Sequence, residues 1–200
     1  MYDKNEEHKQ CKIITFNARA FYVNSTYNSN LVYIDLPESL TSFGIYALTG
    51  CELLEITSLP EFTPDGDKHR ISCSGLLMNC GRIMGPSDTY VIDVEKWPKE
   101  LTLPYTVALL GSQLFADAGW NQYTIGTNSN PLTNEALIEY LNDTDKLWSV
   151  NLVNSIKRPV NITIYFNKSA EVTSDQVKQC FMEKIEGDDL TNFTVTASAV

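Results

Sequence analysis

Few residues of this 200-residue chain combine the types and spacing that chemistry requires. His8 lies in a polar segment and His69 follows a turn, and a lone loop histidine is usually solvated rather than a base or a metal ligand. Asp65 and Asp67 flank a glycine, but no glutamate follows at the spacing of a calcium-binding loop. We therefore interpret the aspartate pair as part of a turn.

The five cysteines do not form a recognisable site either. Cys11, Cys51, Cys73, Cys80 and Cys180 are scattered, with neither a C-x-x-C pair nor a histidine at zinc spacing. An odd, scattered set does not resemble the disulfide framework of a small secreted domain. We expect reduced thiols that are mostly buried as small apolar side chains, and we expect no metal and no cofactor.

Motifs of the common enzyme classes are missing from the sequence as well. There is no G-x-G-x-x-G, no phosphate-binding loop and no H-E-x-x-H, and Ser72–Gly75 lacks the pattern of a nucleophile elbow. Asp143 with Asp145, and Asp188 with Asp189, fall in expected loops, where paired carboxylates are usually solvated. We expect a protein without catalytic residues, and an enzyme with an unfamiliar site is the less favoured alternative.

Aromatic and charged residues are better candidates for a binding surface. Tyrosines cluster around an Asn-rich loop and tryptophans stand near expected strand ends, and both residue types are enriched at interfaces. The commoner role of such rings is to close the open ends of a core. The candidate partner contacts are Tyr2, Lys4, Glu6, Glu7, Tyr22, Tyr27, Tyr33 and Trp120.

The charge balance disfavours two classes of partner. The formal net charge is −10, whereas contacts to nucleic-acid phosphates need an excess of lysine and arginine. The same balance disfavours an anionic membrane surface, and no apolar run reaches the roughly 18 residues of a spanning helix. We expect protein partners, no nucleic acid and no membrane.

Two opposing features bear on the compartment. Residues 1–12 hold no apolar core that could serve as a signal peptide, which favours synthesis in a cytoplasm. Five N-x-S/T sequons would instead suit a secreted glycoprotein. The sequons lie at Asn24, Asn142, Asn161, Asn167 and Asn192. We expect a virion or the host cytoplasm, with a secreted protein as the alternative.

The clearest structural signals lie near the C-terminus. Apolar and polar residues alternate over Val160–Phe166 and again over Phe193–Ala199, which predicts two half-buried strands. Between them, Thr173 and Gln176 form a capping box, and the apolar spacing that follows predicts a helix with Phe181 on its buried face. This stretch is therefore expected to be a strand, a helix and a strand.

The rest of the chain shows short strand patterns, separated by turn signals roughly every ten residues. We expect strands over 12–23, 31–36, 43–48, 53–57, 90–94, 105–110 and 149–153, and a short helix over Thr133–Leu141. Residues 70–84 are expected to form a strand, a turn at Asn79–Gly81 and a second strand. Both closing strands keep a polar face, which a parallel sheet covered on both sides would not tolerate. We find no internal repeat. The pattern predicts a mainly β fold, a jelly-roll-like and largely antiparallel β-sandwich with two short helices, and α+β is the alternative.

The domain organisation and function follow from these features. Residues 1–11 are a polar N-terminal arm, and residues 12–200 are a single β-rich domain with a candidate crossover at 97–104. We expect a non-enzymatic structural protein that acts through protein–protein contacts, in a homo-oligomer or with capsid or tail neighbours. The favoured class is a virion component, such as a phage capsid decoration, head-fibre or tail-ring subunit. The alternative is a secreted or surface β-sandwich glycoprotein that binds a protein or carbohydrate partner through its loops.

Overall fold

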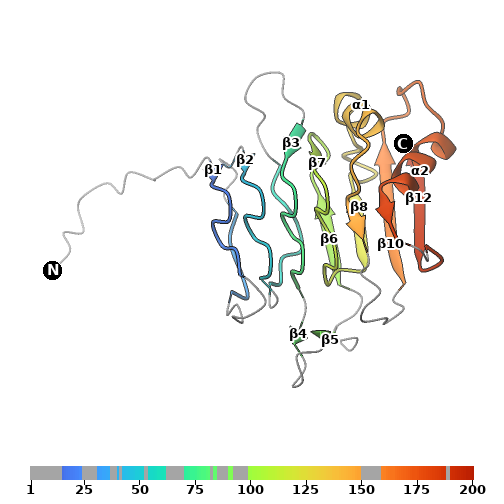
Figure 1. Cartoon of the computed structure of the whole chain (residues 1–200). Coiled ribbons are helices and arrows are strands. Elements are labelled where there is room, and N and C mark those ends of the chain that lie inside the picture. The colour runs from blue at the N-terminus through green and yellow to red at the C-terminus, as the bar shows by residue number, and fades with distance from the viewer. Residues whose placement is uncertain are drawn as a thin grey trace, which may run out of the picture.

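The chain winds into a stack of parallel coils, where a coil is one passage of the backbone around the stack (Figure 1). The computed structural model describes residues 15–23, 31–36, 40, 42–51, 54–61, 70–81, 83–84, 90–91, 99–149, 159–187 and 190–200. Each coil contributes a segment to each of two layers. One layer contains the parallel sheet, and the other contains turns in the first four coils and a helix with a short strand in the last two. Such stacks bury their core between successive coils, so each coil depends on its neighbours.

The first layer is a sheet of four strands, all parallel. They are β6 (Glu100–Leu103), β8 (Gln122–Ile125), β10 (Val160–Phe166) and β12 (Phe193–Ala199). Their order in the sheet is β12-β10-β8-β6, so each strand pairs with the next one along this series. A parallel bridge between Ser58 and Thr102 extends the sheet to the preceding coil.

The sheet has one buried and one polar face. Along β10 the side chains alternate between buried and half-buried positions, as the sequence pattern predicts. On the polar face the register aligns a row of threonines across all four strands, namely Thr102, Thr124, Thr163 and Thr196. The hydroxyl of Thr196 donates to that of Thr163 at 3.4 Å. The second layer covers the buried face alone, so a parallel sheet tolerates polar residues here.

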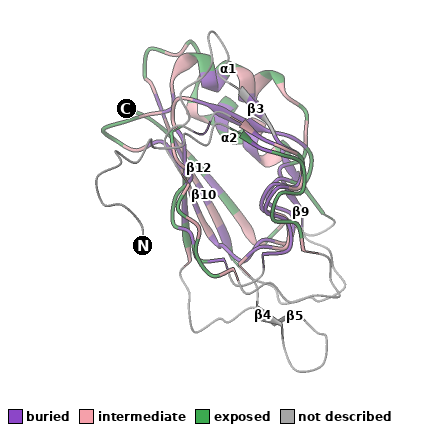
Figure 2. Cartoon of the chain, turned by 90° about the vertical axis from the view of Figure 1, so that its left-hand side faces the viewer, coloured by how far each residue is buried: buried purple, intermediate pink, exposed green. Residues whose placement is uncertain are grey.

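In the first four coils, the second layer consists of turn runs, which are stretches of consecutive turns. They comprise residues 17–23, 44–50, 73–79 and 111–117. Within a run, alternate N–H groups donate backwards along the chain, as Thr49 N does to Tyr46 O. The intervening N–H groups donate to the following coil, as Gly50 N does to Met78 O at 2.9 Å. Figure 2, which looks along the stack, shows the coiled segments on the side of the core opposite the sheet.

Left-handed backbone recurs at equivalent places in the turn runs. One stacked set with positive φ comprises Arg19, Tyr46, Gly75 and Gln113, and a second comprises Gly50, Asn79 and Asp117. Glycine adopts this conformation without strain, whereas other residues do so at a cost. At Gly50 a Cβ would also overlap the C=O oxygen of Val23 in the preceding coil.

Short strands and two helices complete the coils. The parallel pairs are β1 (Thr15–Phe16) with β2 (Ser42–Phe43), β3 (Arg70–Ser72) with β7 (Ala108–Leu110), and β9 (Trp148–Ser149) with β11 (Ile185–Glu186). A small antiparallel pair joins β4 (Ile83–Met84) to β5 (Tyr90–Val91). Helix α1 (Asn134–Asn142) leads to β9, and α2 (Ser174–Glu183) leads to β11. Neither helix is long and apolar enough to cross a bilayer, and the other described residues form no such helix.

Side-chain caps fix where both helices begin. The Thr133 side chain accepts a hydrogen bond from Ala136 N at the start of α1. At the start of α2, Thr173 accepts from Gln176 N while the Gln176 side chain accepts from Thr173 N, which is the expected capping box. Phe181 on α2 is fully buried, so the predicted apolar face of this helix is confirmed.

Large apolar side chains fill the space between the layers. In the C-terminal half, the ring of Trp148 stacks on Phe115 at a centroid distance of 5.3 Å and lies 5.6 Å from that of Tyr123. Phe181 adds its ring at 6.5 Å from Trp148. In the N-terminal half the interior is mostly aliphatic, including the fully buried Leu48 and Leu77. One continuous core therefore runs along the stack.

The predicted largely antiparallel β-sandwich is wrong. The main sheet is parallel, the two helices alternate with its later strands, and the arrangement is α/β-like, so the α+β alternative does not fit either. The expected strand over 43–48 falls mostly in a turn run, whereas the expected helix near Thr133–Leu141 and the closing strand, helix and strand are confirmed. The segment 97–104 contains β6, a strand of the main sheet.

Candidate functional site

The first described coil, of which residues 15–23 and 31–36 are described, exposes large apolar side chains. We call Phe21, Tyr22, Val32 and Tyr33 the N-terminal coil patch. Tyr33 is the most exposed of them, at 67%. Ile45 on the second coil is also exposed, and Ile138 on α1 is the remaining large exposed apolar residue within the described parts of the chain. The exposed apolar side chains thus concentrate at one end of the stack.

The same end of the stack presents main-chain carbonyl oxygens. In the first turn run, the N–H groups of Arg19, Phe21 and Val23 donate to the carbonyls of the second coil. Each later run accepts such bonds from the run before it. The equivalent acceptors of the first run are the carbonyls of Ala18, Ala20 and Tyr22, for which the described residues supply no donor. All hydrogen bonds between turn runs point the same way, so this edge carries acceptors alone.

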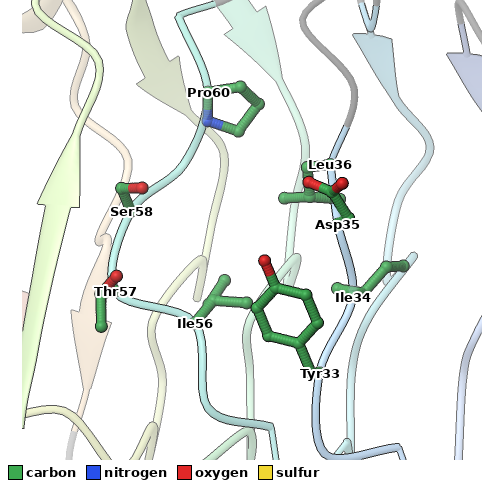
Figure 3. Close-up of a pocket in the computed structure, with 8 residues that line it drawn as sticks. All are labelled: Tyr33, Ile34, Asp35, Leu36, Ile56, Thr57, Ser58 and Pro60. Atoms are coloured by element: carbon green, nitrogen blue, oxygen red, sulfur yellow. The ribbon is translucent and has the colours of Figure 1, made fainter.

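A hollow of about 120 Å³ lies between the first two coils. Its lining residues are Tyr33, Ile34, Asp35, Leu36, Ile56, Thr57, Ser58 and Pro60. Below it the two segments are joined by Glu55 N, which donates to Val32 O at 2.7 Å. Figure 3 shows the Tyr33 hydroxyl, the Asp35 carboxylate and the Ser58 hydroxyl around the space that opens beyond this bond.

Backbone geometry adds polar groups to the hollow. Thr102 N donates to Thr57 O at 2.8 Å, and Leu59 N donates to Thr102 O at 2.9 Å. In a parallel ladder this pairing directs the N–H and C=O of the intervening Ser58 to the opposite side, toward the first coil. The hollow is therefore bordered by a carboxylate, hydroxyls and a main-chain carbonyl, and neither lysine nor arginine is among its lining residues.

The predicted contact residues have different outcomes. Tyr22 and Tyr33 are exposed and belong to the N-terminal coil patch. Trp120 is fully buried, and its indole Nε1–H donates to Ile56 O at 2.9 Å while Lys99 Nζ lies 5.1 Å from its ring centroid. We therefore remove Trp120 from the candidate surface. Four residues of the N-terminal arm and one loop residue lie outside the described residues, namely Tyr2, Lys4, Glu6, Glu7 and Tyr27.

The described cysteines are positioned as core residues. Cys51, Cys73 and Cys80 are buried, with the Cys51 thiol donating to Phe21 O at 3.4 Å, and Cys180 is partly exposed. Burial raises the pKa of the Cys73 and Cys80 thiols well above the ordinary value. Among the described residues, no group of three or more His, Cys, Asp or Glu side chains is placed to hold a metal ion. His8, His69, Asp65, Asp67, Asp188 and Asp189 lie outside the described residues.

Sequence reasoning missed the acceptor edge and the hollow because it missed the repeat. The turn runs share a pattern in which two apolar residues sit at fixed places, as in Ala47–Leu48, Leu76–Leu77 and Leu114–Phe115. A Gly, Asn or Asp follows two residues later, at Gly50, Asn79 and Asp117. This pattern is the signal that could have revealed the coils, although its copies are unequally spaced.

The chain matches no known family model, no curated protein and no solved structure.

Proposed function

We propose that this chain is a non-enzymatic structural protein that joins an assembly through its N-terminal coil. The observation that carries the proposal is the concentration of exposed large apolar residues, Phe21, Tyr22, Val32 and Tyr33, on that one coil. Exposed apolar side chains that are scattered singly need no explanation, but a group of them marks a contact surface. Aromatic residues in particular are enriched at protein–protein interfaces.

The coil architecture supports the same surface. In a stack of coils, each inner coil covers its neighbour, so the terminal coil needs a polar outer face or a partner. The first described coil has apolar rings and main-chain acceptors instead of a fully polar face. A partner that covers this coil would remove the rings from water, which is worth roughly 25 cal/mol per Å² of apolar area.

The kind of assembly stays a prediction. The sequence is the basis for the prediction that the protein is a virion component with capsid or tail neighbours or a homo-oligomer. The exposed residues of the N-terminal coil support a contact surface, and they do not bear on the type of assembly. The alternative of a secreted or surface glycoprotein predicts glycans at the sequons. An intact mass of the protein from its native host separates the two, because glycans would add discrete mass increments.

Hydroxyl-radical footprinting tests the surface even when the partner is unidentified. Oxidation of Tyr22 and Tyr33 is compared between material from the native host and the purified full chain. We expect several-fold less oxidation of both tyrosines in the native material, because a partner would cover them. Ile138, which is 53% exposed on α1, serves as the internal control and should be oxidised equally in both samples. Equal oxidation of the two tyrosines in both samples would overturn the proposal.

A pair of variants gives a second test. The double substitution Tyr22→Ser and Tyr33→Ser removes two rings from the patch while leaving the buried core unchanged. We expect a native circular dichroism spectrum and loss of co-sedimentation with the native assembly. The matched variant Ile138→Ser, which also removes an exposed apolar side chain, should co-sediment normally. Normal co-sedimentation of the double variant would show that the coil makes no essential contact.

A further inference from the structure

We propose that the hollow between the first two coils receives an arginine side chain of the partner. This inference rests on the proposed function, because it identifies the chemistry of the segment that docks on the N-terminal coil. The hollow is bounded by Tyr33–Leu36 on the first coil and Ile56–Pro60 on the second (Figure 3). It opens where the two coils separate beyond the bond from Glu55 N to Val32 O.

The size of the hollow suits a single side chain. At about 120 Å³ it is well below the roughly 300–1,000 Å³ of a pocket for a drug-sized ligand. Its lining residues combine apolar Ile34, Leu36, Ile56 and Pro60 with polar Asp35, Thr57 and Ser58, and Tyr33 adds both a ring and a hydroxyl. An arginine matches this division, because its methylene stem packs on apolar surface while its charged head remains among polar groups.

The hollow offers a carboxylate, hydroxyls and the Ser58 carbonyl as hydrogen-bond acceptors beside the Ser58 N–H, and the negative charge of the carboxylate attracts a cation. The Asp35 carboxylate can accept two parallel N–H bonds from a guanidinium group. The exposed ring of Tyr33 offers a face for a cation–π contact, and Ser58 directs its main-chain carbonyl to the same space. Neither lysine nor arginine is among the described residues that line the hollow, and the proposal assigns the cation for these groups to the partner.

The acceptor edge on the same coil supports a donor-rich partner independently. An ordinary strand offers N–H and C=O groups in alternation, so it would place carbonyls against the carbonyls of Ala18, Ala20 and Tyr22. A second copy that met this edge with its own edge would do the same. A segment that presents side-chain N–H groups avoids this conflict, and arginine has five such donors.

The coil already contains one example of the proposed contact. The guanidinium carbon of Arg19 lies 5.4 Å from the ring centroid of Tyr22, which is a cation–π arrangement on the exposed surface. Arginine is favoured over lysine in the hollow for three reasons. Its planar guanidinium group can donate two parallel hydrogen bonds to one carboxylate, it stacks on aromatic rings, and it is more weakly hydrated than an ammonium group.

The test is a titration of the ¹⁵N-labelled full chain, followed by NMR at constant ionic strength. The probe is Nα-acetyl-arginine-N-methylamide, and the neutral isostere Nα-acetyl-citrulline-N-methylamide is its control. We expect amide shift changes confined to Val32–Leu36 and Glu55–Leu59. The arginine derivative should bind at least about tenfold more tightly than the citrulline derivative, which corresponds to about 1.4 kcal/mol.

Matched variants locate the binding. Asp35→Asn should abolish the preference for arginine, whereas Glu171→Gln, which removes the same charge from an exposed position after β10, should keep it. Tyr33→Phe keeps the ring and should bind normally, and Tyr33→Ser should bind more weakly. An unchanged preference in Asp35→Asn, or equal binding of both probes, would overturn the inference. Equal binding of the lysine derivative would overturn the assignment to arginine.

The two proposals fail in different ways. Protection of Tyr22 and Tyr33 in native material, with no preference for the arginine probe, would support the assembly surface and refute the arginine site. Binding of the probe without protection of the tyrosines would refute the assembly surface, and with it the claim that a partner supplies the arginine.

Discussion

Lys184, at the end of α2, is joined to Asp143, at the end of α1. The Lys184 ammonium group donates to the main-chain oxygen of Asp143 at 2.6 Å and lies 3.5 Å from its carboxylate oxygen Oδ2. The lysine side chain is only 2% exposed, while that of the aspartate is 16% exposed. A cation in such a place needs its partner, because desolvation of an unpaired charge costs several kcal/mol. The contact fixes the two helix ends relative to each other.

The first prediction concerns this pair. Asp143→Asn should destabilise the protein by about 3 kcal/mol, because it leaves the buried ammonium without a counter-charge. Lys184→Met, which removes the charge and keeps the apolar stem, should cost less. Urea unfolding of both variants and the wild type measures the difference. A larger loss for Lys184→Met than for Asp143→Asn would show that packing of the lysine, rather than its charge, governs the site.

The second prediction concerns Phe181 on α2. Phe181→Ala should destabilise the protein by about 3–5 kcal/mol, because its ring is fully buried and contacts Tyr140 at a centroid distance of 5.1 Å. Lys178→Ala on the exposed face of the same helix should change stability by less than about 0.5 kcal/mol. Thermal or urea unfolding distinguishes the two. Similar costs for both variants would contradict the packing of α2 against the core.

The third prediction tests the turn layer at Gly50. Gly50→Ala should cost at least about 2 kcal/mol, because φ is +78° there and the new Cβ would meet the Val23 carbonyl. Gln113→Gly should be neutral or slightly stabilising, since Gln113 also has a left-handed backbone but lies on the surface. Urea unfolding measures both. Free tolerance of alanine at position 50 would contradict the bond from Val23 N to Thr49 O that draws the coils together.

The fourth prediction follows from the buried thiol of Cys73. Burial raises its pKa above the ordinary 9.0, so the folded protein keeps a proton that the unfolded chain loses. Stability is therefore unaffected below about pH 8 and falls as the pH rises above 9.0, by up to about 1.4 kcal/mol per pH unit for this group. Cys73→Ala should reduce the slope of unfolding free energy against pH in that range. Equal slopes for wild type and variant would contradict the burial of this thiol.

The sequence predicted the C-terminal part of the fold because its signals there are local. The alternation over Val160–Phe166 and the capping box of Thr173 and Gln176 each specify an element within a few residues. The direction of strand pairing is not local. The polar face of β10 led to an antiparallel prediction, since parallel sheets are usually covered on both sides. The turn layer covers one face of this sheet, so the premise of that prediction does not apply here.

The N-terminal coils were missed for a different reason. Three of the left-handed positions in the turn runs are occupied by Arg19, Tyr46 and Gln113, and none of these residue types signals positive φ in a sequence. In the turn runs, successive N–H groups donate alternately within the same coil and to the next coil, which is not the pairing of a β-strand. The apolar pairs of these runs, such as Ala47–Leu48, nevertheless resemble short strands in the sequence. Of the candidate contacts, which were selected by residue type, Tyr22 and Tyr33 are exposed, and their role as contacts stays a prediction. Asp35 and Ser58 come together only through the stacking of coils.

The one-way hydrogen bonding of the turn layer has an evolutionary consequence. The hydrogen bonds between turn runs go from the N–H groups of one run to the carbonyls of its successor, as the bonds from Arg19 N to Ile45 O and from Tyr46 N to Ser74 O illustrate. At the start of the second run, Gly44 N donates in the opposite direction, to Phe16 O. If the first coil were lost, the second would present the carbonyls of Ile45, Ala47 and Thr49 in its place. Duplication or deletion of whole coils would therefore change the length of the molecule, while its first turn run would still present unpaired carbonyls as hydrogen-bond acceptors.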